Sequence, residues 1–532
     1  MRKFDMPGRS EVFAENGMVA TSHPLASASA LAVLREGGSA VDAALSAAMV
    51  LSVVEPQMTG IGGDCFAIIS DPASASSSGL MHAINGSGRS AAGADIDWFN
   101  DNGIKSIKDN SVHSITVPGA LKAFDELHKK FGILAWDRLF TDAIKVAEDG
   151  FAVSSRVAFD WAKNLDALSI DEGAAQHLLV DGNVPKTGDR VQFKALAKTL
   201  SQISEQGIDA FYKGEIADEI IATVQAKGGF LTKEDLANVE ADWVEPISTN
   251  YAGYQVLEIP PNGQGMVTMI MLNLMELLDV RSFEHNSPDR YHYEIEIGRI
   301  AYSIRDAMLA DPEHMTMSIE ELVSVEFAKT LMDQVLPLKR NENIVLPELP
   351  SADTVYLTVA DQNGQMISLI YSVYTDFGSK IVTPNSGVVL QSRGACFNTI
   401  KGHPNAIGPS KRPMHTIIPA FALKDGKPFV SFGVMGGAYQ PMGQAHVFSN
   451  LVDHGFNPQE ALDHPRMFWA EDGVLEAEST ISRSVIAGLK ARGHEIRQSN
   501  TPIGGGQMIQ INENGFYCAG SDPRKDGLAI GY

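Results

Sequence analysis

The spacing of apolar residues changes near residue 354, and this change limits what the chain can fold into. Before it, apolar residues recur three or four positions apart, as in Ala120–Phe131, which predicts helices, and the Ala-rich segment Ala40–Val54 predicts a helix buried on all sides. After it, β-branched and aromatic runs alternate with short turns containing Asp, Asn and Gly, which predicts antiparallel hairpins. Helices followed by hairpins in one chain favour a layered α+β fold over alternating βαβ units.

Three hairpins are predicted in the last third of the chain. They join residues 354–360 to 366–374, 421–424 to 428–434, and 507–512 to 516–519. A Gly436-Gly437 pair follows the second hairpin. The first hairpin begins with Thr354, directly behind residues 346–353, which contain two prolines and no helix signal. We therefore expect an exposed connector that ends at a threonine.

The charge of the chain excludes several classes of partner. Its 532 residues include 42 Lys and Arg against 65 Asp and Glu, a formal net charge of −23 at pH 7. Without a clustered basic patch this charge repels phosphate backbones and anionic lipids, so we expect neither a nucleic-acid nor a membrane partner. The first residues lack the continuous apolar stretch of a secretory signal, which predicts a cytoplasmic protein.

Common cofactor and metal motifs are missing from the sequence. Cys65, Cys396 and Cys518 lie far apart, and the fourteen histidines include no HExxH pair, so neither a disulfide framework nor a metal site is predicted. The glycine-rich segments 60–63 and 504–506 match neither a dinucleotide-binding nor a P-loop pattern, and there is no GxSxG elbow. We expect chemistry that needs no cofactor.

A threonine behind a connector and a glycine pair after a strand fit one type of catalysis. Chain cleavage before Thr354 would leave its hydroxyl as nucleophile and its own α-amine as general base, since an α-amine has an unperturbed pKa of about 7.7 to 8.0. The N–H groups of Gly436 and Gly437 could then hold the developing oxyanion. From these residues alone, the alternative that Thr354 is an ordinary packing residue of a strand stays open.

Nearly the whole chain consists of ordered sequence blocks. They include GGSAVDAALSAAMVLSVVEP from Gly37, TGIGGDCFAII from Thr59, PPNGQG from Pro260, DTVYLTVADQNGQ from Asp353, GVMGGAYQP from Gly433 and SDPRKDGLAIGY at the carboxyl terminus. These blocks resemble, in family order, those of the γ-glutamyltransferases, also called γ-glutamyl transpeptidases or glutathione hydrolases. Chance does not explain so many blocks in one order.

The resemblance implies an N-terminal nucleophile hydrolase, built as a single intertwined αββα four-layer sandwich and made as an inactive precursor. Cleavage between Asp353 and Thr354 would give a large subunit of residues 1–353 and a small subunit of residues 354–532. These two subunits of one precursor would be each other's partners. A homodimer of such processed heterodimers is one assembly open to the protein.

The same resemblance implies the catalytic residues. Thr354 would be the nucleophile of both autoprocessing and catalysis, and Ser372 on the return strand would hydrogen-bond to it. Gly436 and Gly437 match the oxyanion glycines of the family. No metal or cofactor takes part in this chemistry.

The sequence departs from the family where substrates are recognised. A stretch resembling NNQMDDF holds the donor's α-ammonium in the family, but residues 391–397 read QSRGACF here. Arg393 replaces the amide and Cys396 the carboxylate. A guanidinium repels an ammonium, whereas it binds a carboxylate bidentately.

Four further residues are candidates for substrate binding beside Arg393. His415 and Thr416 stand where the family has paired serines, and Tyr374 follows Ser372 on the return strand. Arg89 lies two positions from the family arginine that takes the substrate carboxylate in a D-x-R-E segment. We expect these side chains to line the pocket.

The departures resemble the branch of the family that includes oxamate amidohydrolases and glutaryl-type cephalosporin acylases. The resulting hypothesis is an amidohydrolase or acyltransferase whose small amide substrate has a carboxylate-bearing acyl group without an adjacent ammonium. A true glutathione hydrolase or γ-glutamyltransferase with an unusual donor pocket is the first alternative. An unprocessed pseudoenzyme with a binding role is the second.

Overall fold

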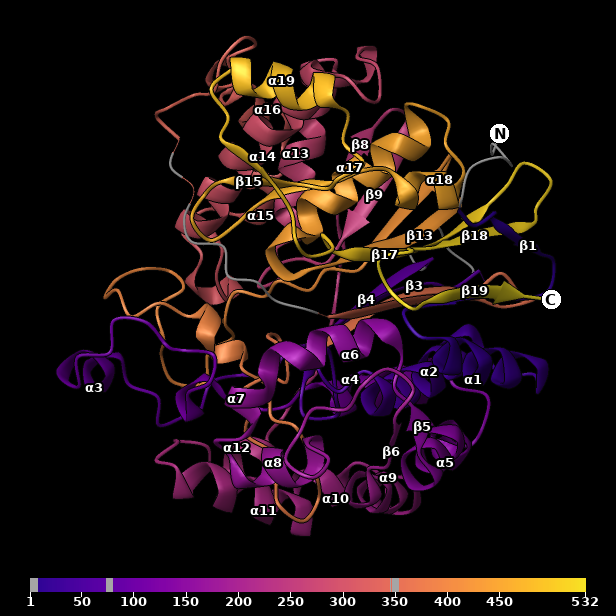
Figure 1. Cartoon of the computed structure of the whole chain (residues 1–532), viewed down its shortest axis with the longest axis vertical. Coiled ribbons are helices and arrows are strands. Elements are labelled where there is room, and N and C mark those ends of the chain that lie inside the picture. Colours follow the sequence, from indigo (N-terminus) through magenta and orange to yellow (C-terminus); the bar gives the residue numbers. More distant parts are fainter. Residues whose placement is uncertain (1–7, 73–79, 345, 347–353) are drawn as a thin grey trace.

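Two seven-stranded sheets lie face to face in the centre of the protein, and helices cover the outer face of each sheet (Figure 1). The structure is a computed structural model that describes residues 8–72, 80–344, 346 and 354–532. The order of layers is the αββα sandwich implied by the family resemblance, and it confirms the predicted α+β class.

The strands of both sheets come from distant parts of the chain. In spatial order, the first sheet contains β1 (Val12–Ala14), β18 (Tyr517–Ser521), β17 (Gly505–Ile511), β13 (Lys427–Met435), β12 (Ala420–Lys424), β9 (Tyr254–Glu258) and β8 (Ile247–Tyr251). The second sheet contains β19 (Leu528–Gly531), β2 (Met18–Thr21), β10 (Val355–Ala360), β11 (Met366–Ser372), β3 (Asp64–Ser70), β4 (Met81–Gly86) and β7 (Asp242–Val244).

The parts before and after residue 354 share both sheets. The β10–β11 hairpin pairs with β2 on one side and β3 on the other, so it lies inside a sheet between two strands of the first part. In the other sheet, β9 of the first part pairs with β12 of the second. The chain is therefore a single intertwined body, and its first part supplies strands as well as helices.

Each helical layer packs on its own sheet. The layer over the second sheet contains α1 (Pro24–Arg35), α2 (Ala40–Val54), α4 (Ala120–Phe131), α5 (Thr141–Asp149), α6 (Ser155–Trp161), α7 (Leu165–Leu168), α8 (Glu172–Leu178), α9 (Lys194–Gln206), α10 (Asp209–Tyr212), α11 (Glu215–Ala226) and α12 (Lys233–Ala237), with α3 (Ile96–Asp101) further out (Figure 1). The layer over the first sheet contains α13 (Gly265–Leu277), α14 (Pro288–Met308), α15 (Ile319–Leu322), α16 (Val325–Lys329), α17 (Gln440–Val452), α18 (Pro458–Asp463) and α19 (Arg483–Ala491). Small sheets are formed by β14 (Met467–Trp469), β15 (Leu475–Ala477) and β16 (Ile496–Gln498), and by β5 (Phe151–Ala152) and β6 (Arg190–Val191).

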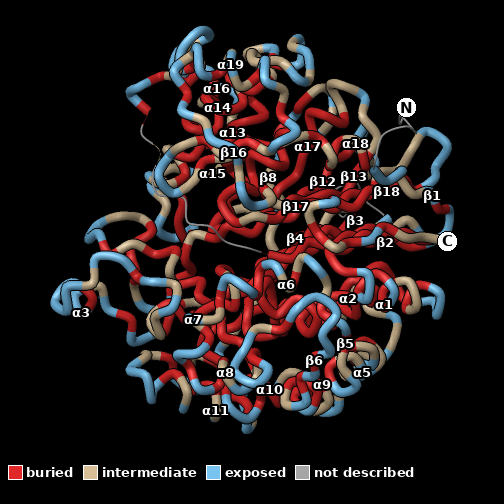
Figure 2. Tube along the Cα trace, viewed as in Figure 1, coloured by how far each residue is buried: buried red, intermediate tan, exposed pale blue. Residues whose placement is uncertain are grey.

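Three large apolar clusters fill the spaces between the four layers. Figure 2 shows that buried backbone runs through both sheets and the inner helices, while the outer helices and loops are exposed. The predicted helix Ala40–Val54 forms with these bounds, and every residue in it is buried. Its serine N-cap and capping box fix its start. The three cysteines are buried and form no disulfide.

The three predicted hairpins form as β10–β11, β12–β13 and β17–β18. One boundary was wrong, because the return strand of the first hairpin ends at Ser372 and not at residue 374. Tyr374 has a φ of 84°, outside the extended region, so the chain turns away from the sheet there. In the described part of the chain, no helix is both long and apolar enough to span a bilayer.

Buried neutral histidines predict loss of stability in mild acid. Burial lowers the pKa of His23 to about 4 and that of His415 and His494 to about 3. Unfolded histidines bind a proton below about pH 6.5, so each such group destabilises the fold by about 1.4 kcal/mol per pH unit as pH falls below that value. Burial raises the pKa of Glu55 to about 7 and that of Asp453 to about 6, and buried carboxyls such as these oppose the trend. We expect a lower urea midpoint at pH 5 than at pH 7; an equal or higher midpoint would contradict this.

Candidate active site

Thr354 lies at the start of the central hairpin with its hydroxyl against a second hydroxyl. Val355 of β10 is opposite Tyr371 of β11, so this register brings Thr354 beside Ser372 at the end of the return strand. Thr354 Oγ1 donates to Ser372 Oγ at 3.2 Å, and Ser372 Oγ also accepts the Tyr374 N–H at 2.8 Å. Both hydroxyl-bearing residues are buried. The predicted contact between Thr354 and Ser372 is therefore present.

The turn after β13 requires glycine. Gly436 has a φ of 114° and Gly437 a φ of 56°, both in the region that side chains disfavour. A Cβ on Gly436 would also come within 2.9 Å of Gly504 Cα. The two glycines hold the backbone in a tight turn that opens α17, a geometry suited to presenting N–H groups to an anion.

The packing of the two sheets brings this turn over Thr354. Two contacts set the register, Thr358 Oγ1 with Ser431 Oγ at 2.7 Å and the Tyr356 ring against Gly433. From Tyr356, two residues back along the chain lead to Thr354, directly before β10. From Gly433, two residues forward lead to Met435 at the end of β13, so Thr354 and Met435 lie opposite each other. Because Met435 directly precedes Gly436, the nucleophile candidate and the glycine turn lie at the same end of the sandwich.

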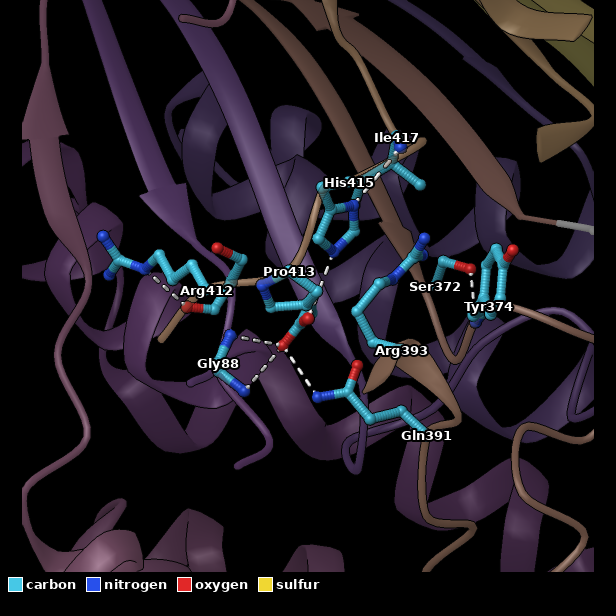
Figure 3. A network of polar contacts seen from close by, with 12 residues as sticks. Gly88, Ser372, Tyr374, Gln391, Arg393, Arg412, Pro413, His415 and Ile417 are labelled. Carbon is cyan, nitrogen blue, oxygen red and sulfur yellow. Dashed lines mark hydrogen bonds and ion pairs between the residues drawn. The ribbon is translucent and has the colours of Figure 1, made fainter. Parts of the chain in front are cut away.

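Arg393 is a fully buried guanidinium next to this pair. It begins the 3₁₀ turn η8 (Arg393–Cys396), its Nη1 donates to Thr416 Oγ1 at 2.8 Å, and its Cζ lies 4.2 Å above the centre of the Tyr374 ring. Arg393 Nε and Nη2 have no hydrogen-bond partner among the described residues. In Figure 3, Arg393 lies beside Ser372 and Tyr374. Three of the predicted binding residues, Tyr374, Arg393 and Thr416, are thus brought together.

A buried glutamine joins the guanidinium site to the glycine turn. Gln264 Nε2 donates to the carbonyl of Thr416 at 2.7 Å and to that of Gly437 at 3.0 Å. Its Oε1 accepts from Arg305 Nη1 at 2.9 Å. Gln264 has no distinguishing sequence signal beyond its place in the PPNGQG block, yet its amide connects both parts of the site.

His415 is engaged inside the protein and faces a carboxylate (Figure 3). Its Nε2 lies 3.1 Å from Asp64 Oδ2, and its Nδ1 accepts the Ile417 N–H at 3.3 Å. Burial, helped by the nearby Arg393 charge, lowers the pKa of His415 to about 3, so the ring is neutral. Asp64 Oδ1 further accepts from the backbone N–H of Gly88 and Gly119 and from Gln391 Nε2. Both ring nitrogens of His415 are thus engaged by other residues of the protein.

Asp64 was missed from the sequence. Its one signal is its place directly after the Gly60-to-Gly63 turn, at the start of β3. A lone carboxylate at the beginning of an apolar strand is costly to bury unless several donors surround it. Here four donors do so, and they tie four distant segments to the start of β3: Gly88, Gly119, Gln391 and His415.

Arg89 has different surroundings. Its Nη1 lies 3.2 Å from Asp311 Oδ2 and 3.1 Å from the Ser410 carbonyl oxygen, and its side chain is 36% exposed. It lines a cavity of about 450 Å³ together with Ser87 and Val117. In the described structure its side-chain hydrogen bonds do not reach Thr354 or Arg393, so the two candidate arginines are not brought together.

Two further predictions concern the scissile bond and metals. Asp353 lies outside the described residues. Among the residues that the structure covers, no cluster of three His, Cys, Asp or Glu side chains is arranged to hold a metal ion.

These features fit the comparisons with known proteins. A family model described as gamma-glutamyltranspeptidase matches residues 26–532. The chain belongs to this family. Relatives include the glutathione hydrolase-like YwrD proenzyme of Bacillus subtilis, 34% identical over 97% of this chain and 98% of the relative, and the oxamate amidohydrolase proenzyme of Klebsiella pneumoniae, 32% identical over 97% and 98%. The crystal structure of cephalosporin acylase from Bacillus halodurans is 36% identical, with a TM-score of 0.91 over 100% of this chain and 99% of that one.

Membership of the γ-glutamyltranspeptidase family settles the class of protein. The four-layer body is that of an N-terminal nucleophile hydrolase, and the chain is an enzyme of the amidohydrolase and acyltransferase kind. The pseudoenzyme alternative is thereby set aside at the level of the family. The relatives are named after several different substrates, so the substrate has to be argued from the site.

Proposed function

We propose that this γ-glutamyltranspeptidase-family enzyme cleaves itself between Asp353 and Thr354 into subunits of residues 1–353 and 354–532. It then hydrolyses a small amide whose acyl group carries a carboxylate but no adjacent ammonium. The observation that carries the substrate class is the buried Arg393 guanidinium. Two of its nitrogens have no hydrogen-bond partner among the described residues. It lies over the ring of Tyr374, whose backbone N–H in turn donates to Ser372.

The proposed reaction is acyl transfer in two steps. The Thr354 hydroxyl attacks the amide carbonyl while its α-amine takes the proton and passes it to the leaving amine. The N–H groups of Gly436 and Gly437 hold the oxyanion, and Ser372 positions the attacking oxygen. Water or an acceptor amine then releases the acyl group from Thr354. Substrate binding by Tyr374, Arg393 and Thr416 places the carbonyl over the nucleophile.

The surroundings of Arg393 support a carboxylate rather than an ammonium. Its contacts are the Thr416 hydroxyl, the Tyr374 ring and Cys396 Sγ at 3.8 Å, none of which is an anion that would bind an ammonium. A buried guanidinium with open donors gains most from a planar anion, because its fork matches two carboxylate oxygens. We do not assign this role to Arg89, since Asp311 already occupies its guanidinium.

Substrate profiling tests the proposal against its alternative. The name of one similar protein, an oxamate amidohydrolase, supports an acyl group with a carboxylate and no ammonium, and the name of another, a cephalosporin acylase, supports the cleavage of an amide. The name of the glutathione hydrolase-like relative supports the alternative of a true γ-glutamyl hydrolase or transferase. We expect turnover of glutaryl-p-nitroanilide or an oxamyl amide to exceed that of γ-glutamyl-p-nitroanilide. Substantial γ-glutamyl turnover with none of the other two would contradict the proposal.

Replacement of the second hydroxyl gives a further prediction. In Ser372→Ala we expect kcat to fall by about 10- to 100-fold with little change in KM, because Thr354 loses a hydrogen bond worth about 1.5 to 3 kcal/mol when charge develops on it. Ser368→Ala is the matched control, since Ser368 is a buried serine on the same face of β11 that contacts Tyr356. Equal losses in the two variants would argue for a packing effect alone.

The assembly and the location stay predictions. A homodimer of processed heterodimers would elute from a sizing column at twice the mass of the cleaved chain. The cytoplasmic location awaits cell fractionation.

A further inference from the structure

A buried lysine lies beside the candidate active site and has no part in the chemistry proposed above. Lys525, between β18 and β19, is only 3% exposed. An ammonium is costly to bury, and in a site shielded from water its charge acts strongly on neighbouring groups. Contacts on two sides define where its side chain runs.

On one side, the lysine reaches the segment next to the nucleophile hairpin. Lys525 Nζ lies 3.7 Å from Met58 Sδ, and the Met58 carbonyl accepts the Val373 N–H at 3.4 Å. Val373 directly follows Ser372, whose Oγ accepts a hydrogen bond from the Thr354 hydroxyl. The ammonium is therefore close to the end of the hairpin that carries the nucleophile.

On the other side, the stem of the lysine packs on the strands that lead to the glycine turn. A Cβ built on Gly505 would lie 2.7 Å from Lys525 Cγ, 3.0 Å from Lys525 Cε and 3.2 Å from Met435 Cε. Gly505 pairs with Met435, the residue that precedes Gly436 and that the sheet register places opposite Thr354. Lys525 thus lies between the nucleophile strand and the oxyanion strand.

We propose that the Lys525 ammonium keeps the α-amine of Thr354, exposed by chain cleavage, unprotonated near neutral pH so that it can act as general base. The inference rests on the proposed cleavage before Thr354. An unperturbed α-amine, with a pKa of about 7.7 to 8.0, is mostly protonated at pH 7. A second cation a few ångströms away, in a site shielded from water, disfavours protonation and lowers such a pKa by about one to three units.

Other charged groups face this lysine and modulate its effect. Glu55, at the end of α2, is fully buried; burial raises its pKa to about 7, and Lys525 opposes that rise. Asp526 and Arg156 act on the same carboxyl, and Asp526 accepts the Arg156 N–H at 2.8 Å. His23 is neutral, because burial lowers its pKa to about 4. The balance between Lys525 and Glu55 therefore sets the local charge.

The test measures the pKa of the Thr354 α-amine in the cleaved enzyme. Competitive acetylation with acetic anhydride over a range of pH, followed by mass spectrometry of the small subunit's first peptide, gives this pKa without a substrate. In Lys525→Met we expect it to rise by about one unit or more, and the acidic limb of kcat/KM for glutaryl-p-nitroanilide to move to higher pH. Lys525→Arg should restore both values.

Glu55→Gln is expected to change the pKa of the Thr354 α-amine in the opposite direction. It removes the acidic group of the cluster and leaves Lys525 in place, so the amine pKa should fall. An unchanged amine pKa in Lys525→Met overturns the inference, even if that variant is less stable. If Lys525→Met does not fold or is not cleaved, the measurement on Glu55→Gln replaces it. An unchanged α-amine pKa in Glu55→Gln then overturns the inference. A wild-type chain that is never cleaved before Thr354 contradicts the proposed function instead.

Discussion

Thr354→Ala is expected to yield one band of precursor size on a denaturing gel, whereas two bands are expected of the wild-type chain. The variant lacks the hydroxyl that attacks the preceding carbonyl, so neither autoprocessing nor acyl transfer can begin. We expect amide turnover to fall by more than about a thousandfold, as for other enzymes that lose their nucleophile. The structure favours normal folding of this variant, because Thr354 is a small side chain at the end of a well-paired hairpin, where its hydroxyl contacts Ser372.

Two control variants separate chemistry from folding. Thr354→Ser keeps a hydroxyl and an α-amine, so we expect it to be cleaved and active, although more slowly. Thr358→Ala removes a buried threonine from the same face of β10, where its hydroxyl contacts Ser431. That variant should still split into two bands. A Thr354→Ala chain that splits at the same place would refute the assignment of the nucleophile.

The sequence was most informative where local patterns decide the structure. Ala40–Val54 combines small apolar residues with a serine cap, and it forms a helix with those bounds. The turn residues at 361–364 correctly marked the central hairpin, and its first residue, Thr354, contacts Ser372 as expected. The hydrogen bonds of these elements form between residues close in sequence, which is why one chain segment is enough to predict them.

Long helix α14 shows where pattern reasoning fails. It carries Arg290, Glu294, Glu296 and Arg299, all buried, which hides the apolar periodicity of a core helix. Arg290 pairs with Glu294 and Arg299 with Glu296 within the helix, so these charges satisfy one another away from water. Burial of paired charges cannot be read from hydropathy, because the same residues on a surface helix would give the same sequence.

The site was only partly predictable for a related reason. His415 and Asp64 meet across 351 positions of sequence, and Gln264 contacts Thr416 and Gly437 across 152 and 173 positions. No local signal announces such contacts, since they depend on the packing of the two sheets. Arg89 illustrates the converse, because its sequence position suggested the pocket while Asp311, brought close only by the fold, takes its guanidinium.

Arg393→Met is expected to abolish the preference for carboxylate-bearing acyl groups. With glutaryl-p-nitroanilide we expect kcat/KM to fall by about 100- to 1,000-fold, because the substrate loses two charge-assisted hydrogen bonds. Each is worth about 1.5 to 3 kcal/mol, and their contributions are only partly additive. Most of the loss should appear in KM, because the guanidinium binds a group remote from the reacting carbonyl. Methionine keeps the volume and the contact with the Tyr374 ring, so the fold should survive.

A neutral substrate supplies the internal control for this variant. Butyryl-p-nitroanilide lacks the terminal carboxylate, so its slow turnover should be similar in the wild-type enzyme and in Arg393→Met. Arg393→Lys should recover only part of the glutaryl activity, since an ammonium cannot bind a carboxylate bidentately. In Arg89→Met we expect the glutaryl activity to stay within about tenfold of wild type, because loss of an exposed ion pair costs little. A large loss in Arg89→Met with none in Arg393→Met would assign carboxylate recognition to Arg89 and would contradict the binding site proposed around Arg393.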